Sequence, residues 1–441
     1  MADFEVEVIG GGLAGCEAAF RAANRGLRVR LWEMKPTRFS PAHELTTLAE
    51  LVCSNSLRSD RPESAVGLLK EELRALGSLV LAAADQTRVP AGGALAVDRQ
   101  LFSQAVTRAI EAHPRLELAR AEVGSWPAGR APVVVAGGPL ASESLVRLLA
   151  GLAGRPQLHF YDALAPIVTH ESLDLARIYP ANRYQDGAGD YLNCPLSREE
   201  FDRFLAALLA ADQVTARAFE DQRFFEGCLP VEVMAQRGPR TLVFGPMKPV
   251  GLTDPATGRR PYAVVQLRRE NQAGTLWNMV GFQTRLTKPA QQKVFRLIPG
   301  LGRAEFARFG AIHRNTYLDA PQVLDEFQRF RGAERIFAAG QISGVEGYVE
   351  SAASGLWVGE NAARSARGRP LLKSRPTFAL GALMTHLRGY GGGRYFSPAN
   401  VTFGLFDPPP ADIPKNHRPV WLMETARRDF AAFAAELDEV W

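Results

Sequence analysis

The first 33 residues constrain the fold more than any other stretch of the chain. Residues 4–9 are mostly apolar, as in a buried strand, and lead directly into the run Gly-Gly-Gly-Leu-Ala-Gly at 10–15. Small residues typical of a tightly packed helix follow, and residues 28–32 have the pattern of a second strand that ends at Glu33. A G-x-G-x-x-G turn between strand and helix, with an acid ending the next strand, predicts a Rossmann-type dinucleotide site.

Each glycine of this turn has its own expected role. Gly10 allows the tight turn, Gly12 lets backbone amides approach a pyrophosphate, and Gly15 lets the helix pack closely on the sheet. The free N–H groups of the helix N-terminus favour phosphates, and Glu33 can accept the two ribose hydroxyls of an adenosine. The alternative is a glycine turn that binds nothing. The expected cofactor-binding residues here are Gly10, Gly11, Gly12, Leu13, Ala14, Gly15, Glu33 and Lys35.

A second strand-to-helix unit occurs late in the chain. Residues 335–341 read as a buried strand ending in glycine, and a helix of small residues runs from Tyr348 to about Ala366. Such a unit, paired with an N-terminal G-x-G-x-x-G, is typical of FAD-binding Rossmann proteins. We expect the backbone near this helix to approach a flavin, although a plain helix entrance is the alternative. The residues concerned are Gly340, Gln341, Gly344 and Gly347.

The region between these two units has a different pattern. Its segments mix strands and helices without βαβ regularity, which predicts an inserted domain. The length of 441 residues also favours more than one domain. The fold class predicted is α/β: a Rossmann-type FAD-binding domain with an inserted mixed α+β domain. We expect residues 1–183 and 313–441 to form the two parts of the FAD-binding domain and residues 184–312 to form the insertion.

Local patterns give further expectations. Residues 44–52 have helix-like periodicity, residues 64–81 read as one amphipathic helix, and residues 241–249 read as extended chain. The late aromatic residues Trp277 and Phe282 could stack on bases, but a place in the core is the safer interpretation.

The distribution of charge says more than the net charge of +5. From residue 268 to residue 314 there are nine basic residues against two acidic ones, a formal charge of +7. This basic segment is either a solvated helical face or a surface that follows nucleic-acid phosphates. Its members are Arg268, Arg269, Arg285, Lys288, Lys293, Arg296, Arg303, Arg308 and Arg314.

The cysteines form no C-x-x-C pair and have no zinc-ligand spacing; they are Cys16, Cys53, Cys194 and Cys228. This usage predicts a reducing cytoplasm and argues against a dithiol reductase. No apolar run approaches the length of a membrane span, and we expect no signal peptide and no membrane partner.

Several stretches together resemble one family. They are residues 10–15, Trp-Glu-Met-Lys-Pro at 32–36, Ser-Pro-Ala-His at 40–43, Glu-Leu-Val-Cys-Ser-Asn-Ser-Leu-Arg at 50–58, 90–99, Phe-Glu-Gly-Cys-Leu-Pro-Val-Glu at 225–232, 313–317, and 340–348. The chain resembles the folate- and FAD-dependent tRNA (uracil-5-)-methyltransferases over nearly its whole length. The stretches around Cys53 and Cys228 are far more specific than the glycine turn.

The resemblance implies a reaction. The family makes 5-methyluridine at position 54 of the tRNA T loop, taking the carbon from 5,10-methylenetetrahydrofolate and the electrons from FAD reduced by NAD(P)H. It implies tRNA, folate and reduced nicotinamide as partners, and no obligate protein partner. By resemblance, Cys228 would add to C6 of the uracil, which activates C5, and Cys53 would assist near the flavin. A thiolate suits this step because it is both a good nucleophile and a good leaving group.

Other assignments remain open from the sequence. Cys16 is expected to be structural, whereas Cys194 precedes Pro195 at an expected helix start, where a helix dipole could lower its pKa. His313, Asn315 and Tyr317 could contact folate or RNA, or be structural. Three other functions remain: a flavin enzyme that modifies the wobble uridine with a GTPase partner, a non-catalytic RNA-binding flavoprotein, and a general NAD(P)H oxidoreductase.

Overall fold

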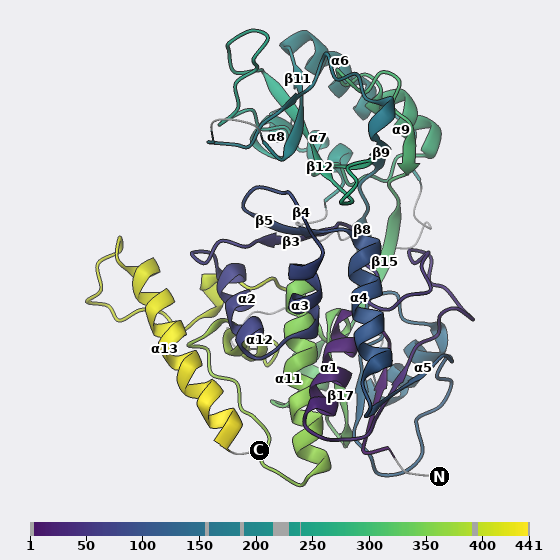
Figure 1. Cartoon of the computed structure of the whole chain (residues 1–441), viewed down its shortest axis with the longest axis vertical. Helices are drawn as coiled ribbons and strands as arrows, with labels where there is room; N and C mark the ends of the chain where they lie inside the picture. Colours follow the sequence, from purple (N-terminus) through teal and green to yellow (C-terminus); the bar gives the residue numbers. More distant parts are fainter. Residues whose placement is uncertain are drawn as a thin grey trace.

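The computed structural model describes residues 4–154, 158–185, 189–214, 229–238, 240–389 and 396–439. Its lower part in Figure 1 is built on a six-stranded sheet with the order β16-β17-β7-β1-β2-β6. Five of these strands are parallel, and only the edge strand β16 is antiparallel. Their bounds are β1 Val6–Ile9, β2 Val29–Trp32, β6 Leu116–Ala119, β7 Val133–Val135, β16 Arg329–Phe330 and β17 Ala333–Ala338. The predicted α/β class with a Rossmann-type sheet is confirmed.

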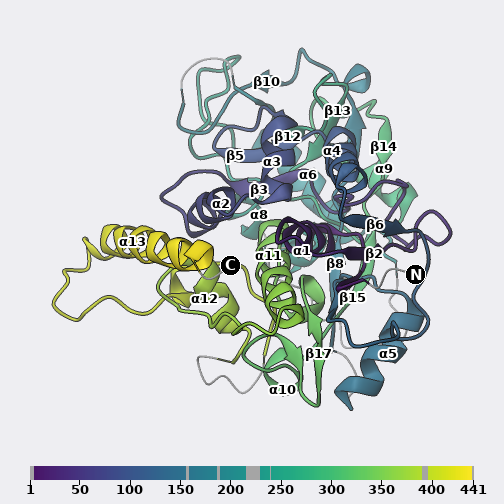
Figure 2. The same cartoon turned by 60° about the horizontal axis from the view of Figure 1, so that its bottom comes forward.

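Two helices from opposite ends of the chain pack together beside this sheet. They are α1 (Leu13–Asn24) and α11 (Tyr348–Ala366), and Figures 1 and 2 both show them side by side. A Cβ atom on Gly359 would lie 2.5 Å from the carbonyl oxygen of Ala18, and one on Gly355 would clash with the backbone of Ala14. The helices therefore approach more closely than side chains at these positions would permit, and the predicted span of the late helix is confirmed.

The segment read as one helix over residues 64–81 forms two, α2 (Ala65–Ala75) and α3 (Leu79–Gln86). Gly77, with φ of +73°, ends the first, and the Ser78 hydroxyl caps the second by accepting the Leu81 amide. The buried carboxylate of Glu17 accepts two further amides of the same helix start. A side chain distant in sequence thus stabilises a helix end that local periodicity did not predict.

Residues 44–52 contain no helix, so the expectation from periodicity is wrong there. The Glu50 carboxylate accepts the amides of Glu44 and Leu45, at 2.9 and 3.0 Å, so the segment folds back on its own side chain. Ala49, with φ of +51°, donates its amide to the carbonyl of Gly11 at 2.9 Å. The loop is therefore fixed to the glycine turn.

A second, antiparallel sheet forms the upper part of Figure 1, with the order β10-β11-β12-β13-β9-β14. Trp277 and Phe282 lie in its hydrophobic core, with 4% and 0% of their surfaces exposed, as the safer interpretation predicted. Residues 241–244 form helix α8, so the extended segment expected there is wrong. The strands are β9 Ile167–Thr169, β10 Tyr179–Pro180, β11 Tyr191–Leu196, β12 Ala263–Arg269, β13 Leu276–Met279 and β14 Phe306–Arg308.

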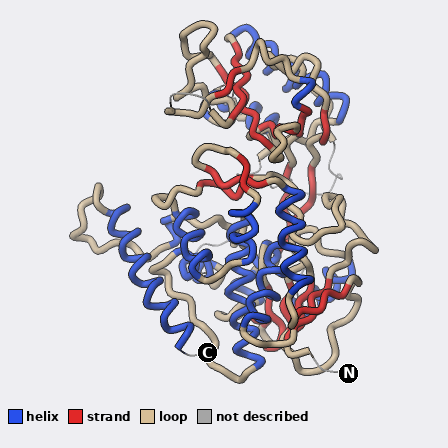
Figure 3. The backbone as a smooth tube through the Cα atoms, in the orientation of Figure 1, coloured by secondary structure: helices blue, strands red, loops and turns tan. Residues whose placement is uncertain are grey.

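The two parts are joined by an antiparallel pair of strands, β8 (Leu158–Ala163) and β15 (Ile312–Tyr317). A three-stranded sheet, β3-β5-β4, lies between the parts; its strands are Ser56–Ser59, Ala94–Val97 and Arg88–Val89. Figure 3 shows most of the long helices in the lower part. The remaining helices are α4 Arg99–Ala112, α5 Glu143–Ala153, α6 Arg198–Leu209, α7 Val231–Gln236, α8 Thr241–Phe244, α9 Lys288–Phe295, α10 Ala320–Val323, α12 Ala379–His386 and α13 Arg418–Glu439.

Candidate active site

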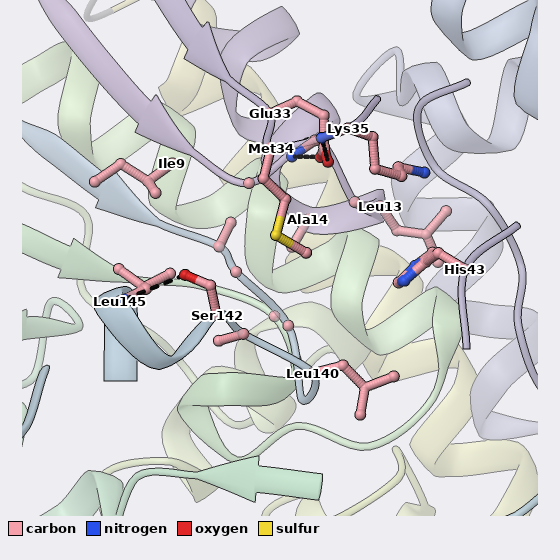
Figure 4. Close-up of a pocket in the computed structure, with 18 of the residues that line it drawn as sticks. Ile9, Leu13, Ala14, Glu33, Met34, Lys35, His43, Leu140, Ser142 and Leu145 are labelled. Atoms are coloured by element: carbon pink, nitrogen blue, oxygen red, sulfur yellow. Dashed lines mark hydrogen bonds between the residues drawn. The ribbon is translucent and has the colours of Figure 1, made fainter. Parts of the chain in front are cut away.

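A first cavity opens at the carboxyl edge of the parallel sheet. It is lined where β1, β2, β7 and β17 end, by Ile9, Trp32, Ala136 and Gly340. This edge is where open α/β sheets bind nucleotides. Figure 4 shows Glu33 and Met34 on one side of the cavity and Leu140 and Ser142 on the other.

The glycine turn leaves space for a ligand at one position only. A Cβ atom on Gly12 would meet no atom within 4 Å, although Gly12 lies at the N-terminus of α1. A Cβ on Gly10, whose φ is +108°, would lie 2.5 Å from the Ala136 carbonyl, and one on Gly15 would clash with the Gly10 carbonyl. The open side at Gly12 faces the cavity, so the turn fits a phosphate-bearing ligand such as the pyrophosphate of FAD.

Glu33 is 7% exposed, and its two carboxylate oxygens accept the amides of Gly11 at 2.8 Å and Lys35 at 2.9 Å. Each oxygen keeps lone-pair capacity for a ribose hydroxyl. Lys35 lines the cavity, but its ammonium donates to the Thr47 carbonyl at 2.7 Å and lies 3.5 Å from Glu50. Its charge is therefore engaged by the neighbouring loop.

The predicted late glycines have different surroundings. Gly340, with φ of +77°, and Gln341 line the first cavity beside Tyr348 at the start of α11. Gly347 lines the adjoining cavity instead. A Cβ on Gly344 would clash with the ring of Phe396, so that glycine allows close packing behind the loop. Gly15 and Gly344 are not among the lining residues of either cavity.

A second cavity adjoins the first and reaches the antiparallel sheet. The two cavities share five lining residues: Val52, Pro139, Leu140, Gln341 and Tyr348. The second is lined by chemically active side chains from five separate segments, including Cys53, Asp162, Arg268, His313 and Glu346. A ligand in the second cavity would therefore lie against one bound in the first.

Cys53 and Tyr348 meet where the cavities join. The Tyr348 oxygen accepts the amides of Cys53 at 2.9 Å and Ser54 at 3.2 Å, and lies 2.8 Å from the Cys53 sulfur. Because two N–H groups occupy its lone pairs, the hydroxyl hydrogen is directed to the sulfur. Burial raises the pKa of Cys53 to about 11, while this hydrogen bond and Arg99 act in the opposite direction. Cys53 is thus a protonated thiol at neutral pH, with a donor in place for a thiolate.

Two acids face the same space. The Glu346 carboxylate accepts a hydrogen bond from the side-chain NH₂ of Gln341 at 2.6 Å, and the Asp162 carboxylate accepts one from the side-chain NH₂ of Asn315 at 2.6 Å. Burial and the charges of Asp162 and Glu350 raise the pKa of Glu346 well above its usual range. The sequence assigns no role to Asp162, because an isolated acid in a strand carries no pattern. Glu346 and Tyr348 lie in the stretch 340–348 that carries the family resemblance, but no local pattern gives either of them a role of its own.

Of the other predicted residues, some line the second cavity and others do not. His313 lines the second cavity, and burial lowers its pKa; Asn315 also lines it and is 3% exposed. Tyr317 is buried beside Phe396. Cys228 lies outside the described residues. The described residues begin again at Leu229, and the amide of Val231 donates to the carbonyl of Gln283, which lines the second cavity.

Cys194 is not at a helix start. It lies within β11 and is fully buried in the core of the antiparallel sheet, and burial raises its pKa, so the expected activation by a helix dipole is wrong. Cys16 is equally buried in α1, with its sulfur 3.3 Å from the Gly11 carbonyl. Both thiols behave as small apolar groups.

The basic segment does not form one surface. Lys288, Lys293, Arg296 and Arg303 are exposed, whereas Arg268 is 7% exposed and lines the second cavity. The Arg296 guanidinium is bonded to the Ala304 carbonyl.

Among the described residues, no group of acids, histidines and cysteines could hold a metal ion. In that same part of the chain, no helix is long and apolar enough to span a bilayer.

Solved structures with this fold include GidA of Aquifex aeolicus. It superposes on 99% of this chain and 73% of its own, with a TM-score of 0.72 at 18% sequence identity, which shows a shared fold.

Family and sequence comparisons are more specific. Residues 5–370 match the family model "Glucose inhibited division protein A". The methylenetetrahydrofolate--tRNA-(uracil-5-)-methyltransferase TrmFO of Geobacter sulfurreducens is 58% identical over 96% of both chains. The TrmFO of Desulfotalea psychrophila is 51% identical over 99% of this chain and 98% of its own. The chain belongs to the glucose inhibited division protein A family and, within it, to the folate-dependent tRNA uracil-5-methyltransferases of the TrmFO type.

Proposed function

We propose that this protein transfers the methylene carbon of 5,10-methylenetetrahydrofolate to C5 of uridine 54 in the tRNA T loop and forms 5-methyluridine with FAD and NAD(P)H. The observation that carries the proposal is full-length similarity, at 51–58% identity, to enzymes named for this reaction. The two adjoining cavities support it, because the reaction needs a flavin next to a second substrate. The wobble-modifying alternative is not favoured by these relatives.

The first cavity has the groups that FAD requires. The amides at Gly12 and the start of α1 would hold the pyrophosphate, and Glu33 would bind the adenosine ribose. Gly340, Gln341 and the start of α11 would face the isoalloxazine ring. Bound there, FAD supplies the reducing equivalents that convert the transferred carbon to a methyl group.

The second cavity would receive folate and the uracil base. Tyr348 holds the amide of Cys53 and directs its hydroxyl at the sulfur, so Cys53 can hold a proton in the resting state and release it to a nearby base. We assign Cys228 as the nucleophile that adds to C6. This assignment rests on the resemblance of residues 225–232 to the methyltransferase family.

The tRNA would be bound by the exposed bases of the inserted region. Lys288, Lys293 and Arg303 are exposed and can reach phosphates, whereas Arg268 and Arg296 have structural partners. A uridine inside a folded T loop must leave its stack before a thiol reaches C6, so we infer that the base is extruded into the second cavity. Because tRNA is the substrate, we place the reaction in the cytoplasm.

The test is a reconstituted reaction with tRNA that lacks 5-methyluridine, 5,10-methylenetetrahydrofolate, FAD and NADPH. Nucleosides from digested tRNA are analysed for 5-methyluridine. Wild-type protein and Cys194→Ala should form it, because Cys194 is remote from both cavities, and Cys228→Ala should not. Absence of product with FAD-loaded wild-type protein that binds tRNA would refute the methyltransferase function and favour the wobble-modifying alternative.

A further inference from the structure

The loop that carries Cys53 is held by side chains from the antiparallel sheet. We define the Cys53 loop as residues 51–55. Arg268, on β12, donates to the Asn55 side-chain oxygen at 2.9 Å and to the Ser54 hydroxyl at 2.7 Å. Asn55 is fully buried and returns a hydrogen bond to the Arg269 carbonyl at 3.0 Å. One end of the loop is thus fixed to a strand more than 200 residues away in sequence.

The other end of the loop is held in a similar way. Arg308, on β14, donates to the Val52 carbonyl and the Ala42 carbonyl, both at 3.1 Å. Arg99, on α4, donates to the Leu51 carbonyl at 2.7 Å and is itself paired with Glu270, which follows β12. Three guanidinium groups therefore contact a five-residue loop, and two of them come from the antiparallel sheet.

We infer that Arg268, Arg308 and the Arg99–Glu270 ion pair act as positioning residues that hold the Cys53 loop, so that the inserted region sets the reactive geometry of the thiol. The inference rests on the role proposed for Cys53. It changes the interpretation of two members of the basic segment. Arg268 and Arg308 bind protein, whereas the sequence left open a solvated helical face or a surface that follows phosphates.

The burial of Arg268 supports this assignment. It is 7% exposed, and its guanidinium donates to the neutral side chains of Asn55, Ser54 and Asn278, while the carboxylate of Glu270 acts on it through charge. Burying a cation that has no carboxylate bonded directly to it is costly, and Glu270 is itself paired with Arg99; the cost is reasonable where the charge assists a neighbouring anion. The Cys53 thiolate would be such an anion. The other charged or titratable groups near the thiol are Tyr348, Asp162, Arg99 and Glu346.

The experiment compares Arg268→Gln with Lys293→Gln, an exposed base of the same segment, in full-length FAD-loaded protein. Cys53 reactivity is measured as the pH profile of iodoacetamide alkylation in a Cys228→Ala background, with Cys53→Ala as the blank. The affinity for tRNA and its salt dependence are measured on the same variants. Arg268→Gln should move the profile about one pH unit upward, or about tenfold in rate below the pKa, with tRNA affinity unchanged. Lys293→Gln should leave the alkylation profile unchanged and weaken the binding of tRNA.

Two further variants keep the test decisive. Arg268→Lys keeps the positive charge but loses the paired hydrogen bonds of the guanidinium to Asn55 and Ser54. Its alkylation profile should therefore lie between those of wild type and Arg268→Gln. Arg308 is half-exposed, and Arg308→Gln should also shift the alkylation profile to higher pH. This variant replaces Arg268→Gln in the test if Arg268→Gln fails to fold. An unmoved profile with weaker tRNA binding would make Arg268 a phosphate ligand and overturn the inference, as would variants that change neither property. Because thiol reactivity is measured without substrate turnover, failure here is distinct from failure of the methyltransferase assay.

Discussion

The first cavity presents a glycine turn with main-chain amides to a ligand, whereas the second presents reactive side chains. Glycines 10–12 and the start of α11 line the first cavity, and its charged lining residues are Glu33, Lys35, Glu50 and Glu122. The second cavity combines a thiol, a phenol, two carboxyl groups and two guanidinium groups from segments far apart in sequence. A cofactor shared by many enzymes is held by backbone geometry, and the reaction peculiar to this family depends on side chains placed around it.

The largest effect should come from the side-chain cavity. Cys53→Ala removes the thiol between the cavities, and we expect kcat for 5-methyluridine formation to fall about 10³-fold or more, because no neighbouring group replaces it. FAD binding should persist, because that site uses backbone. The measurement is single-turnover product formation with FAD absorbance as the check on binding.

Cys194→Ala is the matched control for the loss of a buried thiol. It should retain activity and cost about 1–2 kcal/mol of unfolding free energy. If Cys53→Ala were as active as Cys194→Ala, the second cavity would not be the catalytic one.

The next effect should come from the backbone cavity. A methyl group at Gly12 meets no protein atom, so Gly12→Ala should fold normally. It would occupy the space expected for phosphates, and we expect FAD affinity to fall about 10- to 100-fold, which is about 1.4–2.8 kcal/mol. Fluorescence titration of the apoprotein with FAD measures this change.

Gly15→Ala sharpens the comparison, because its methyl group would clash with the Gly10 carbonyl. This variant should lose about 1–3 kcal/mol of unfolding free energy even without FAD. Equal thermal stability of the two apo variants would show that the turn tolerates both changes, contrary to the geometry.

A smaller effect is expected at the junction of the cavities. Burial raises the pKa of Cys53 to about 11, and the Tyr348 hydrogen bond lowers it. Removing that donor in Tyr348→Phe should therefore raise the pKa further, by about one unit. Iodoacetamide alkylation of Cys53 in the absence of folate and tRNA measures the shift; a profile that moves to lower pH would mean that the sulfur is the donor.

The smallest effect is expected on the outer surface. Lys293 is exposed on α9, and Lys293→Gln should reduce the slope of log tRNA affinity against log salt by about one. Affinity measured from low to moderate salt tests this, with the catalytic rate at saturating tRNA as the control. An unchanged slope would place the tRNA on another face.

The sequence predicted the first cavity far better than the second. The glycine turn, Glu33 and the late helix follow local rules of strand, turn and helix, and the parallel sheet and the span of α11 are confirmed. The second cavity depends on tertiary contacts, such as Asn315 with Asp162 and Arg268 with Asn55, that leave no local pattern. The same reason explains the wrong helix over residues 44–52, where Glu50 binds the amides of its own loop.

The close packing of α1 against α11 has a consequence for synthesis on the ribosome. Residues 13–24 emerge early, but Gly355 and Gly359, against which they pack, emerge more than 300 residues later. Until then, the small apolar face of α1 has no partner and the flavin edge of the first cavity is missing. A nascent chain that stops before residue 348 is therefore expected to be unable to take up FAD, so cofactor loading comes near the end of translation.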